Sequence, residues 1–597
     1  MRIHIFTDAD DLVAYLRSRD ERESLSILDF TGDAGVKDAA GERLLPPVSF
    51  TPGEKEQIMD EYVEAVSEIG AFNRFSLHWL CHPMSEKNDL VPNNLFDRLI
   101  RFLSFRRILS NVGENTLIIL AQEAHLFEDI FRYLAANQMN FAVSGPTPRE
   151  KGTGFSLKKL YSFFLEAAQV QYRFLKSRLF WRKVVKKKTY TVIRTWFDSR
   201  SPGLIANAED VYFGRFPRFL EENGHHILYF GEFGHGFEFE FENLKKDLNH
   251  PVLLGRSLIN GLDYLRAYLF FLSVKWKLRL KPGVKILDTD VGIVFFNYLR
   301  RHCRNPHIRT NYYTYRAAVK LVKKLKIDRF YMPFENYAWE KLTRAAISRY
   351  AGNVKVIAFQ HAQVALNAAK FFLGKAESRS SLLPDTIVTL GEVTRDFLIR
   401  EKNYPHEILK TGCALRHDYS ISNAPRARKR NRRILVQLWS FEKSVQLVNF
   451  VYASGIHVGE GGYSVILNPH PCHPMTKLIP HLDFEYKNQF EIASGSLEEA
   501  ISACDLVIYH GTTTCLDALA GGVPVIDVEF GDFITVDPLF DFHDFKWRVG
   551  APGELAGVIE KIYALSDEDF YRGQKKGFEF VSKYFYPVTV ENLKTFL

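Results

Sequence analysis

The sequence predicts an α/β protein in which two parallel-sheet domains face one another across a cleft, preceded by a smaller α/β region. Residues 463–528 contain three apolar runs rich in β-branched residues, interleaved with polar and helical pieces in the rhythm of a parallel sheet. A similar alternation of strand-like and helical segments runs through residues 190–400. Between the two lies a polar, basic, proline-containing stretch at residues 421–433, which is typical of a linker.

Length and composition indicate a soluble protein of several domains. A chain of 597 residues is too long for one core, and 46% apolar with 25% charged residues is an ordinary globular composition. Acidic residues follow the first short apolar run, and no window approaches about 18 uncharged apolar residues, so neither a signal peptide nor a spanning helix is predicted. The cysteines are scattered without CxxC spacing, which favours reduced thiols in the cytosol and argues against a zinc site.

Residues 1–150 are predicted to form the N-terminal α/β region. Short apolar runs predict strands at residues 3–6, 26–30 and 116–120. Longer stretches with helical apolar spacing predict helices at residues 54–69 and 95–109. Residues 78–94 (HWLCHPMSEKNDLVPNN) are polar and punctuated by proline. This stretch is either a loop that contacts a ligand or a structural connector, and the sequence leaves both open.

Residues 151–189 are predicted to form a basic amphipathic helical segment. Apolar residues recur at helical spacing from Leu160 to Ala167, and the following basic residues, from Arg173 onward, have no acidic residue among them. Such a helix can lie on an anionic membrane face, or it can join two domains with its apolar side docked onto protein. Residues 262–280, aromatic and then basic, are a second candidate of the same kind.

These features define the expected location and partners. We expect a cytoplasmic protein, with peripheral contact at the inner face of the cytoplasmic membrane if either basic helix lies on lipid. The net charge of +8 is small for a chain of this size, and the basic tracts lie on a helix and a linker without a recognised nucleic-acid module. Nucleic acid is therefore not an expected partner.

Residues 190–425 and 426–597 are predicted as two Rossmann-like domains. In the first domain, a helix is predicted at residues 315–325. Strands are predicted after it at residues 329–333, 354–359 and 384–390. A new strand starts at Ile434, just after the basic linker. We therefore place the boundary between the two domains near residue 425.

Two apolar runs of the second domain end in residues suited to holding a phosphate, at the carboxyl ends of strands where ligands of such sheets bind. After residues 464–467, the sequence NPHPCHP contains His470, Pro471 and His473. Proline fixes the backbone, so each histidine side chain keeps one direction and can donate to a phosphate oxygen. The two histidines could instead bind a metal ion, but no third ligand is evident nearby. The other alternative is that the turn is purely structural.

The second run is followed by Gly511, Thr512, Thr513 and Thr514 and then by a helix. Free N–H groups and the positive dipole end at a helix start, together with threonine hydroxyls, stabilise an anion. The alternative is simple N-capping by threonine, which is compatible with phosphate binding. Asp517, one turn into the helix, is placed to accept hydrogen bonds from a ribose.

These motifs carry a resemblance. The series NPHP and GSLEEAISACDLVIYHGTTTCLDALAGGVPVI resembles the C-terminal half of bacterial GT-B glycosyltransferases of surface polysaccharide synthesis, a group related to capsule Kdo transferases and bacterial sialyltransferases. Upstream, PFENYAWEK, AFQHAQV and PDTIVTLGEVTRDFL resemble surface carbohydrate biosynthesis proteins, and the likeness is good from about residue 190 to 540. In such enzymes a His-Pro motif and a Ser/Thr motif hold the nucleotide phosphate, here matching His470-Pro471 and the threonines from Thr512. Gln360-His361 stands where relatives carry Gln-His-Gly, with alanine replacing the glycine.

The resemblance implies a GT-B-like fold and a glycosyltransferase activity. The enzyme would move a sugar, Kdo or a nonulosonate-like one, from a CMP-activated donor to a bacterial surface glycan or glycolipid. The nucleotide sugar is then a substrate, and no cofactor is implied. Two alternatives are a transferase of polyol phosphate from a CDP-linked donor and a non-catalytic glycan-assembly protein of the same fold.

The groups that act on the acceptor are expected in the first Rossmann-like domain. Transfer needs a stabilised leaving phosphate and either a base for the acceptor hydroxyl or a nucleophile. Glu335 is the first candidate, because it directly follows a strand and would point into the cleft, although a helix-capping role is equally compatible. The other candidates are Asp198, Glu232 and His361, whereas Glu340, within a helix, is expected to be structural.

Metal-independent transfer is expected. Asp288 and Asp290 have the spacing of a metal-binding DxD pair, but they lead into an apolar run. Helix N–H groups and histidine donors can take the place of a cation beside the phosphate. No metal ligands are therefore assigned.

Overall fold

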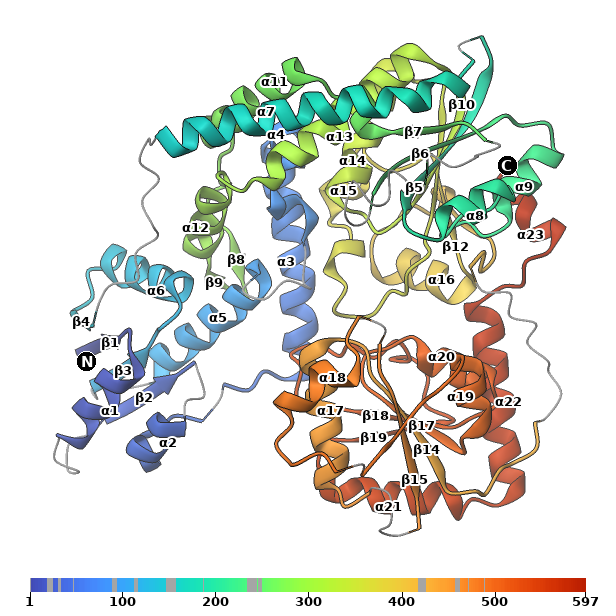
Figure 1. Cartoon of the computed structure of the whole chain (residues 1–597). Coiled ribbons are helices and arrows are strands. Elements are labelled where there is room, and N and C mark those ends of the chain that lie inside the picture. The colour runs from blue at the N-terminus through green and yellow to red at the C-terminus, as the bar shows by residue number, and fades with distance from the viewer. Residues whose placement is uncertain are drawn as a thin grey trace.

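Three parallel sheets organise the computed structural model of the chain (Figure 1). Together with a short antiparallel pair, they confirm the predicted fold class of two Rossmann-like domains after an N-terminal α/β region. The structure describes the following residues: 2–18, 25–30, 34–46, 48–87, 94–111, 116–145, 157–185, 187–233, 244, 250–416, 426–456, 462–470, 472–487 and 489–597.

The N-terminal sheet has the strand order β2-β3-β1-β4. Its strands are β1 (Arg2–Phe6), β2 (Leu25–Asp29), β3 (Thr116–Leu120) and β4 (Phe141–Ser144). The helices of this region include α1 (Ala9–Arg17), α3 (Pro52–Phe72), α5 (Leu95–Asn111) and α6 (Ala124–Ala136). Thr51 and Glu54 form a capping box that starts α3. This helix lies between the N-terminal region and the two larger domains (Figure 1).

The seven-stranded sheet has the order β13-β12-β11-β10-β5-β6-β7. Its strands are β5 (Thr189–Phe197), β6 (Ile227–Phe233), β7 (Val252–Leu254), β10 (Lys326–Pro333), β11 (Lys355–Phe359), β12 (Thr386–Thr389) and β13 (Leu409–Thr411). The chain builds outward from β5 in one direction and from β10 in the other. The sheet therefore has a switch point between β5 and β10, where ligands of doubly wound sheets bind.

The six-stranded sheet repeats this plan with the order β16-β15-β14-β17-β18-β19. Its strands are β14 (Arg433–Gln437), β15 (Ser464–Asn468), β16 (Glu491–Ile492), β17 (Leu506–Tyr509), β18 (Val525–Val528) and β19 (Lys546–Val549). The switch point here lies between β14 and β17. The interiors of the four central strands, β15, β14, β17 and β18, are almost fully buried, as expected where helices cover both sides of a parallel sheet.

A group of helices covers the outer side of the seven-stranded domain. On the outer side of the seven-stranded domain, α7 (Leu157–Ser177) packs against α11 (Gly261–Lys277), and α13 (His307–Lys324) lies beneath them (Figure 1). Among the described residues, no helix combines the length and apolar character needed to cross a membrane.

The C-terminal end of the chain returns to the seven-stranded domain. After α22 (Asp567–Tyr584), the backbone N–H of Tyr586 donates to the Leu390 carbonyl at 2.9 Å. The fully buried Phe596 lies with its ring 4.9 Å from Phe216 and 5.6 Å from Phe359. Burial of such a ring stabilises the fold by about 2–3 kcal/mol, so this segment holds the two domains together.

Candidate functional site

A cavity of about 310 Å³ lies at the switch point of the seven-stranded sheet, at the carboxyl ends of β5, β10 and β11. Aromatic rings and titratable groups line it together with Pro333: Glu86, Trp196, Tyr212, Glu335, Tyr337, Trp339, Glu340 and His361. Two of the four predicted catalytic candidates, Glu335 and His361, therefore share one cavity.

Glu335 is held between His361 and Lys370. Its Oε1 lies 3.3 Å from His361 Nε2, and its Oε2 accepts a hydrogen bond from Lys370 Nζ at 2.5 Å. Burial opposes ionisation of Glu335, but His361 and Lys370 outweigh it and lower the pKa of Glu335 to about 2. A carboxylate with so low a pKa is a weak base, so Glu335 is better suited to orienting its partners than to taking a proton.

His361 is the better placed of the two to accept a proton. Ionised Glu335 accepts from Nε2, so the proton of a neutral ring sits on Nε2 and the lone pair is on Nδ1. Among the described residues, Nδ1 is buried and has no hydrogen-bond partner. The ring is held edge-on to Tyr212, with centroids 4.8 Å apart. The geometry thus moves the role of first catalytic candidate from Glu335 to His361.

Glu340 has the structural role expected of it. Its carboxylate, 2% exposed, accepts from the backbone N–H of Glu335 at 3.0 Å and of Asn336 at 2.9 Å. Asn336 has a left-handed backbone with φ of 61°. Burial, reinforced by the charge of Glu335, raises the pKa of Glu340 to about 8. Glu340 (in α14, Ala338–Tyr350) therefore fixes the turn that carries Glu335.

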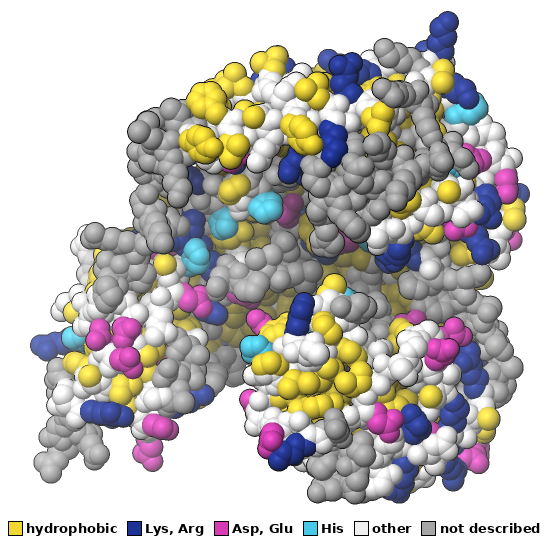
Figure 2. All heavy atoms as spheres, viewed as in Figure 1, with side chains coloured by type: hydrophobic (Ala, Val, Ile, Leu, Met, Phe, Trp, Pro, Cys, Tyr) yellow, Lys and Arg dark blue, Asp and Glu magenta, His cyan; other side chains and the backbone are white. Residues whose placement is uncertain are grey.

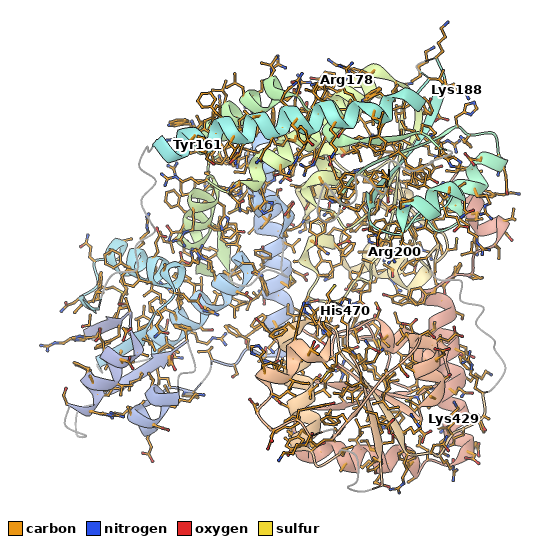
Figure 3. All side chains as sticks on the ribbon, viewed as in Figure 1. Tyr161, Arg178, Lys188, Arg200, Lys429 and His470 are labelled. Atoms are coloured by element: carbon orange, nitrogen blue, oxygen red, sulfur yellow. The ribbon has the colours of Figure 1, made fainter. Side chains whose placement is uncertain are left out.

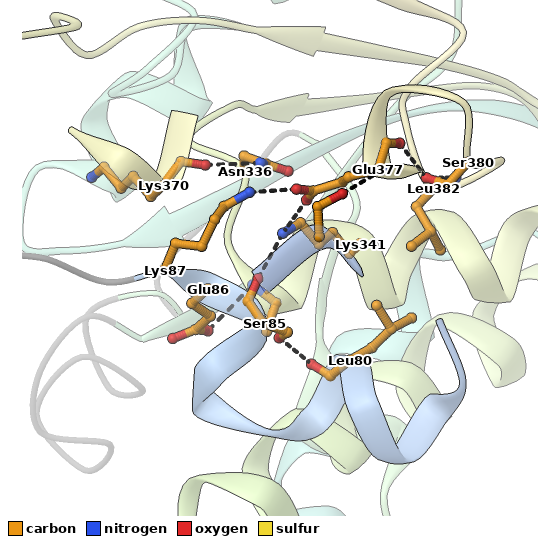
Figure 4. Close-up of polar contacts among 12 residues, drawn as sticks. Leu80, Ser85, Glu86, Lys87, Asn336, Lys341, Lys370, Glu377, Ser380 and Leu382 are labelled. Atoms are coloured by element: carbon orange, nitrogen blue, oxygen red, sulfur yellow. Dashed lines mark hydrogen bonds and ion pairs between the residues drawn. The ribbon is translucent and has the colours of Figure 1, made fainter. Parts of the chain in front are cut away.

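The stretch at residues 78–94 contributes a wall of this cavity. Glu86, at the end of η2 (Pro83–Glu86), accepts from the backbone N–H of Ala338 at 3.2 Å, and burial raises its pKa. The buried Lys87 next to it pairs with Glu377, which also pairs with Lys341 at 2.8 Å (Figure 4). The described part is thus both a packed connector and a cavity wall, while residues 88–93 lie outside the described residues.

The other two candidates lie elsewhere. Asp198 follows β5 and pairs with Arg200 at 2.6 Å, and its Oδ1 accepts from the Arg200 backbone N–H at the start of α8 (Ser201–Ala206). Asp198 is not among the residues that line the His361 cavity. Glu232, in β6, lies in a second cavity with Arg194 and Arg256. The structure does not bring either carboxylate to His361.

The six-stranded sheet has its own cavity, of about 380 Å³, at the carboxyl ends of β17 and β18. His510 directly follows β17 and is 2% exposed. Its Nδ1 lies 2.7 Å from the Val528 carbonyl and its Nε2 lies 3.2 Å from Asp532, which also accepts from Lys443 at 2.7 Å. Burial opposes ionisation of Asp532, but the bonds from His510 and Lys443 prevail and lower its pKa to about 2.

The loop after His510 has a shape that its residues dictate. Gly511 has φ of +64°, and a Cβ there would come 2.7 Å from Val536 Cγ2, so only glycine fits. The Thr514 backbone N–H donates to Thr512 Oγ1 at 3.4 Å, so a threonine hydroxyl accepts from the first N–H of the helix. Thr513 is exposed and its side chain makes no cap hydrogen bond to α20 (Thr514–Ala520). Asp517 is half-buried one turn into that helix.

The His-Pro turn lies at the neighbouring strand end. His470 is exposed, and its Nδ1 accepts from the Cys472 backbone N–H at 3.2 Å. The rings of His470 and His473 are 6.1 Å apart. Pro471 lies outside the described residues. Within the part of the chain that the structure describes, no group of three or more His, Cys, Asp or Glu side chains is arranged to hold a metal ion.

The two halves of the site face one another. Figure 3 places Arg200, which follows β5, and His470, which follows β15, on the facing sides of the two domains. Leu366, which follows β11 in the seven-stranded domain, lines the cavity of the six-stranded domain, as do Pro52 and Lys55 from the first turn of α3. The sequence did not indicate Lys370 or the Asp532 loop. Glu86 belongs to the stretch at residues 78–94 that was a candidate for ligand contact, and His510 was indicated by its position directly after a strand.

The chain was also compared with known proteins. No protein-family model matches it, and no curated protein matches it in sequence. Among solved structures, a glycosyltransferase from Rickettsia africae ESF-5 has 13% identity, covering 68% of this chain and 96% of that chain with a TM-score of 0.37. The glycosyltransferase SnogD from Streptomyces nogalater has 15% identity, covering 68% and 99% with a TM-score of 0.38.

An epimerase is similar to the same extent. The UDP-GlcNAc 2-epimerase from Methanocaldococcus jannaschii has 13% identity, covering 66% of this chain and 98% of that chain with a TM-score of 0.35. Because transferases and an epimerase match alike, the activity has to be argued from the residues themselves.

Proposed function

We propose that this chain is a glycosyltransferase that moves a sugar from a nucleotide-activated donor to a glycan or glycolipid. The observation that carries the proposal is a pair of cavities at the carboxyl ends of strands in two doubly wound sheets. One holds a histidine oriented by a carboxylate, with its second ring nitrogen lacking a hydrogen-bond partner among the described residues. The other adjoins a glycine–threonine turn with an exposed hydroxyl at a helix start.

The division of labour follows from these contacts. In the seven-stranded domain, His361 Nδ1 takes the proton of the acceptor hydroxyl while Glu335 holds the ring and stabilises the imidazolium. In the six-stranded domain, the backbone after Gly511, the Thr513 hydroxyl and His470 bind the phosphate that leaves with the nucleotide. These donors and the positive end of α20 supply the charge stabilisation, so the reaction proceeds without a metal ion.

For the donor, we propose a CMP-activated sugar of the Kdo or nonulosonate kind. Support comes from the sequence likeness of the NPHP and GTTT segments to transferases of that group, and from their positions at neighbouring strand ends, β15 and β17. The acceptor is then a bacterial surface glycan or glycolipid, and the reaction takes place in the cytoplasm.

The test is turnover of a defined donor by the intact chain. Release of CMP from CMP-Kdo is measured with a lipopolysaccharide-type acceptor, in wild type, His361→Asn and the control His406→Asn, an exposed histidine of the same domain. We expect acceptor-dependent release in wild type and the control, and its loss in His361→Asn. Acceptor-independent release, or no release from CMP-, UDP- or CDP-linked donors, would contradict the proposal.

We further propose that the protein works at a membrane surface, on the face formed by α7 and α11. Large apolar side chains stand exposed there, including Tyr161 at 69%, Leu269 at 58% and Trp276 at 68%. Figure 2 shows apolar side chains with Lys and Arg among them along the top of the molecule, over these helices. An apolar helix face with basic residues fits an anionic bilayer.

The acidic residues of the two helices support this reading, because they point away from the face. Glu166 of α7 accepts from Arg309 at 2.8 Å and from Tyr264 at 3.0 Å. Asp263 of α11 is buried and pairs with Lys320 and Arg316. Cosedimentation with phosphatidylglycerol vesicles should exceed that with phosphatidylcholine and should fall in Leu269→Asp. Equal binding to both vesicles would count against the membrane proposal.

A further inference from the structure

The cavity that contains Glu232 has a volume of about 370 Å³ and lies beneath α7. It is called the third cavity here, because it is separate from the cavity at His361 and from the cavity at His510. It is bounded by the carboxyl ends of β5 and β6, by α7 and by α13. Its lining is dominated by charged groups, namely Arg173, Arg194, Arg256, Arg309, Glu166 and Glu232. Four arginines against two glutamates give the cavity an excess of positive charge, which favours an anion.

Arg194 is the unusual member of this set. Its side chain extends from β5 and is 3% exposed, with the guanidinium 5.0 Å from the ring of Trp196 and 5.3 Å from that of Trp339. Nη1 donates to the Thr195 carbonyl at 2.9 Å, but Nε has no hydrogen-bond partner among the described residues. Burial lowers the pKa of Arg194 to about 10, so the group stays charged at neutral pH.

A buried cation is costly unless an anion compensates it. The carboxylate of the lining whose charge acts on Arg194 is Glu232. Its Oε2 lies 3.4 Å from Arg256 Nε and makes no hydrogen bond among the described residues, and burial raises the pKa of Glu232. The other carboxylate, Glu166, is already shared by Arg309 and Tyr264. The lining therefore leaves Arg194 incompletely neutralised.

The cavity adjoins the His361 cavity, because Trp196 lines both. Its α7 wall is the inner side of the helix whose outer side is the exposed apolar face. Aromatic rings of Tyr264 and Tyr313 complete a lining that suits a sugar or an apolar stem beside the charge. An anion bound at Arg194 would thus stand between the lipid-facing surface and the proposed base.

We propose that this third cavity binds a phosphate group carried by the acceptor, with Arg194 as its central ligand. This inference rests on the proposed glycosyltransferase function. The excess of positive charge matches a phosphate dianion better than a single carboxylate, and guanidinium forks bind phosphate in a bidentate manner. The phosphate can belong to a lipid headgroup or to a free sugar phosphate, and both share the recognised chemistry.

The test is binding to the intact chain of glucose 1-phosphate, inorganic phosphate and phosphatidylcholine vesicles with and without phosphatidic acid. The first variant is Arg194→Met, which keeps the bulk of the side chain but removes its charge. The second is Arg173→Gln on α7, which tests the same cavity with a folded protein if Arg194→Met does not fold. The control is Arg349→Gln, exposed on α14. We expect phosphate-dependent binding to weaken at least tenfold in both cavity variants and to be unchanged in the control.

The two sources separate by probe: binding of glucose 1-phosphate alone points to a soluble acceptor, and binding of phosphatidic acid vesicles alone points to a lipid. The proposal is overturned if no probe binds, or if Arg194→Met and Arg173→Gln bind like wild type. Binding of CMP is measured in parallel. If CMP binds and none of the phosphate probes binds, the proposed phosphate site is contradicted but the proposed transferase function is not. If a phosphate probe binds and no nucleotide binds, the proposed transferase function is contradicted.

Discussion

The seven-stranded and six-stranded domains each place a histidine, a carboxylate and a lysine at the carboxyl ends of their strands. The first set is His361, Glu335 and Lys370, and the second is His510, Asp532 and Lys443. The distances from histidine nitrogen to carboxylate are nearly equal, at 3.3 and 3.2 Å. In both sets the partners lower the pKa of the carboxyl group to about 2.

The difference lies in the second ring nitrogen. Nδ1 of His510 is occupied by the Val528 carbonyl at 2.7 Å, so the ring ties the end of β17 to the loop after β18. Nδ1 of His361 has no partner among the described residues. Among the described residues, the ring nitrogen without a hydrogen-bond partner is Nε2 in His510, which faces Asp532, but Nδ1 in His361, which does not face Glu335. His361 therefore has a lone pair that is turned away from its carboxylate and is able to take a proton, whereas His510 ties its loop together.

Removing His361 should have the largest effect. In His361→Asn, we expect kcat for sugar transfer to fall by about 10²–10⁴-fold, because that is the usual contribution of a general base. The affinity for nucleotide should stay within twofold of wild type. Steady-state kinetics with donor and acceptor measure both, and His406→Asn serves as the control. A kcat within threefold of wild type would remove His361 from the chemistry.

Replacing Glu335 should affect stability in a pH-dependent way. A carboxyl group whose pKa falls from about 4.5 to about 2 on folding contributes stability above the unfolded pKa, and this is lost as pH falls towards 2. Glu335→Gln should therefore lower the free energy of unfolding at pH 7 by on the order of 3 kcal/mol. Urea unfolding between pH 7 and 3 should show the gap narrowing below pH 4.5. A pH-independent gap would contradict the proposed ion pairs.

Gly511→Ala should lower the free energy of unfolding by less than Glu335→Gln, and it should act on the six-stranded domain. A left-handed backbone and a Cβ close to Val536 predict a loss of about 2 kcal/mol in the free energy of unfolding. Because the turn would shift, nucleotide affinity should fall as well. Gly553→Ala, where an added Cβ meets nothing within 4 Å, is the matched control for thermal unfolding.

His510→Asn should have the smallest effect on turnover. If His510 only positions the loop after β18, the variant should raise KM for the donor by about tenfold and leave kcat within threefold. A fall in kcat as large as that of His361→Asn would mean that the two histidines do not differ as described.

The sequence predicted the framework well because parallel strands are short, apolar and punctuated by polar turns. Thr512 and Glu335 could be placed in advance, since each follows such a run. Lys370 could not, because its place beside Glu335 depends on packing between distant segments, and Glu86 was indicated only as part of the stretch at residues 78–94. Glu232 was one of the catalytic candidates, but its strand directs it into the arginine-lined cavity, a distinction that spacing does not reveal.

The most direct test of the whole account is calorimetric titration of CMP into the wild-type chain, Thr513→Ala and His361→Asn. If the six-stranded domain holds the nucleotide and the seven-stranded domain carries the base, CMP affinity should fall about tenfold or more in Thr513→Ala and stay unchanged in His361→Asn. Equal affinity in Thr513→Ala and wild type, a loss in His361→Asn alone, or no binding of CMP, CDP, UDP or GDP to wild type would contradict it.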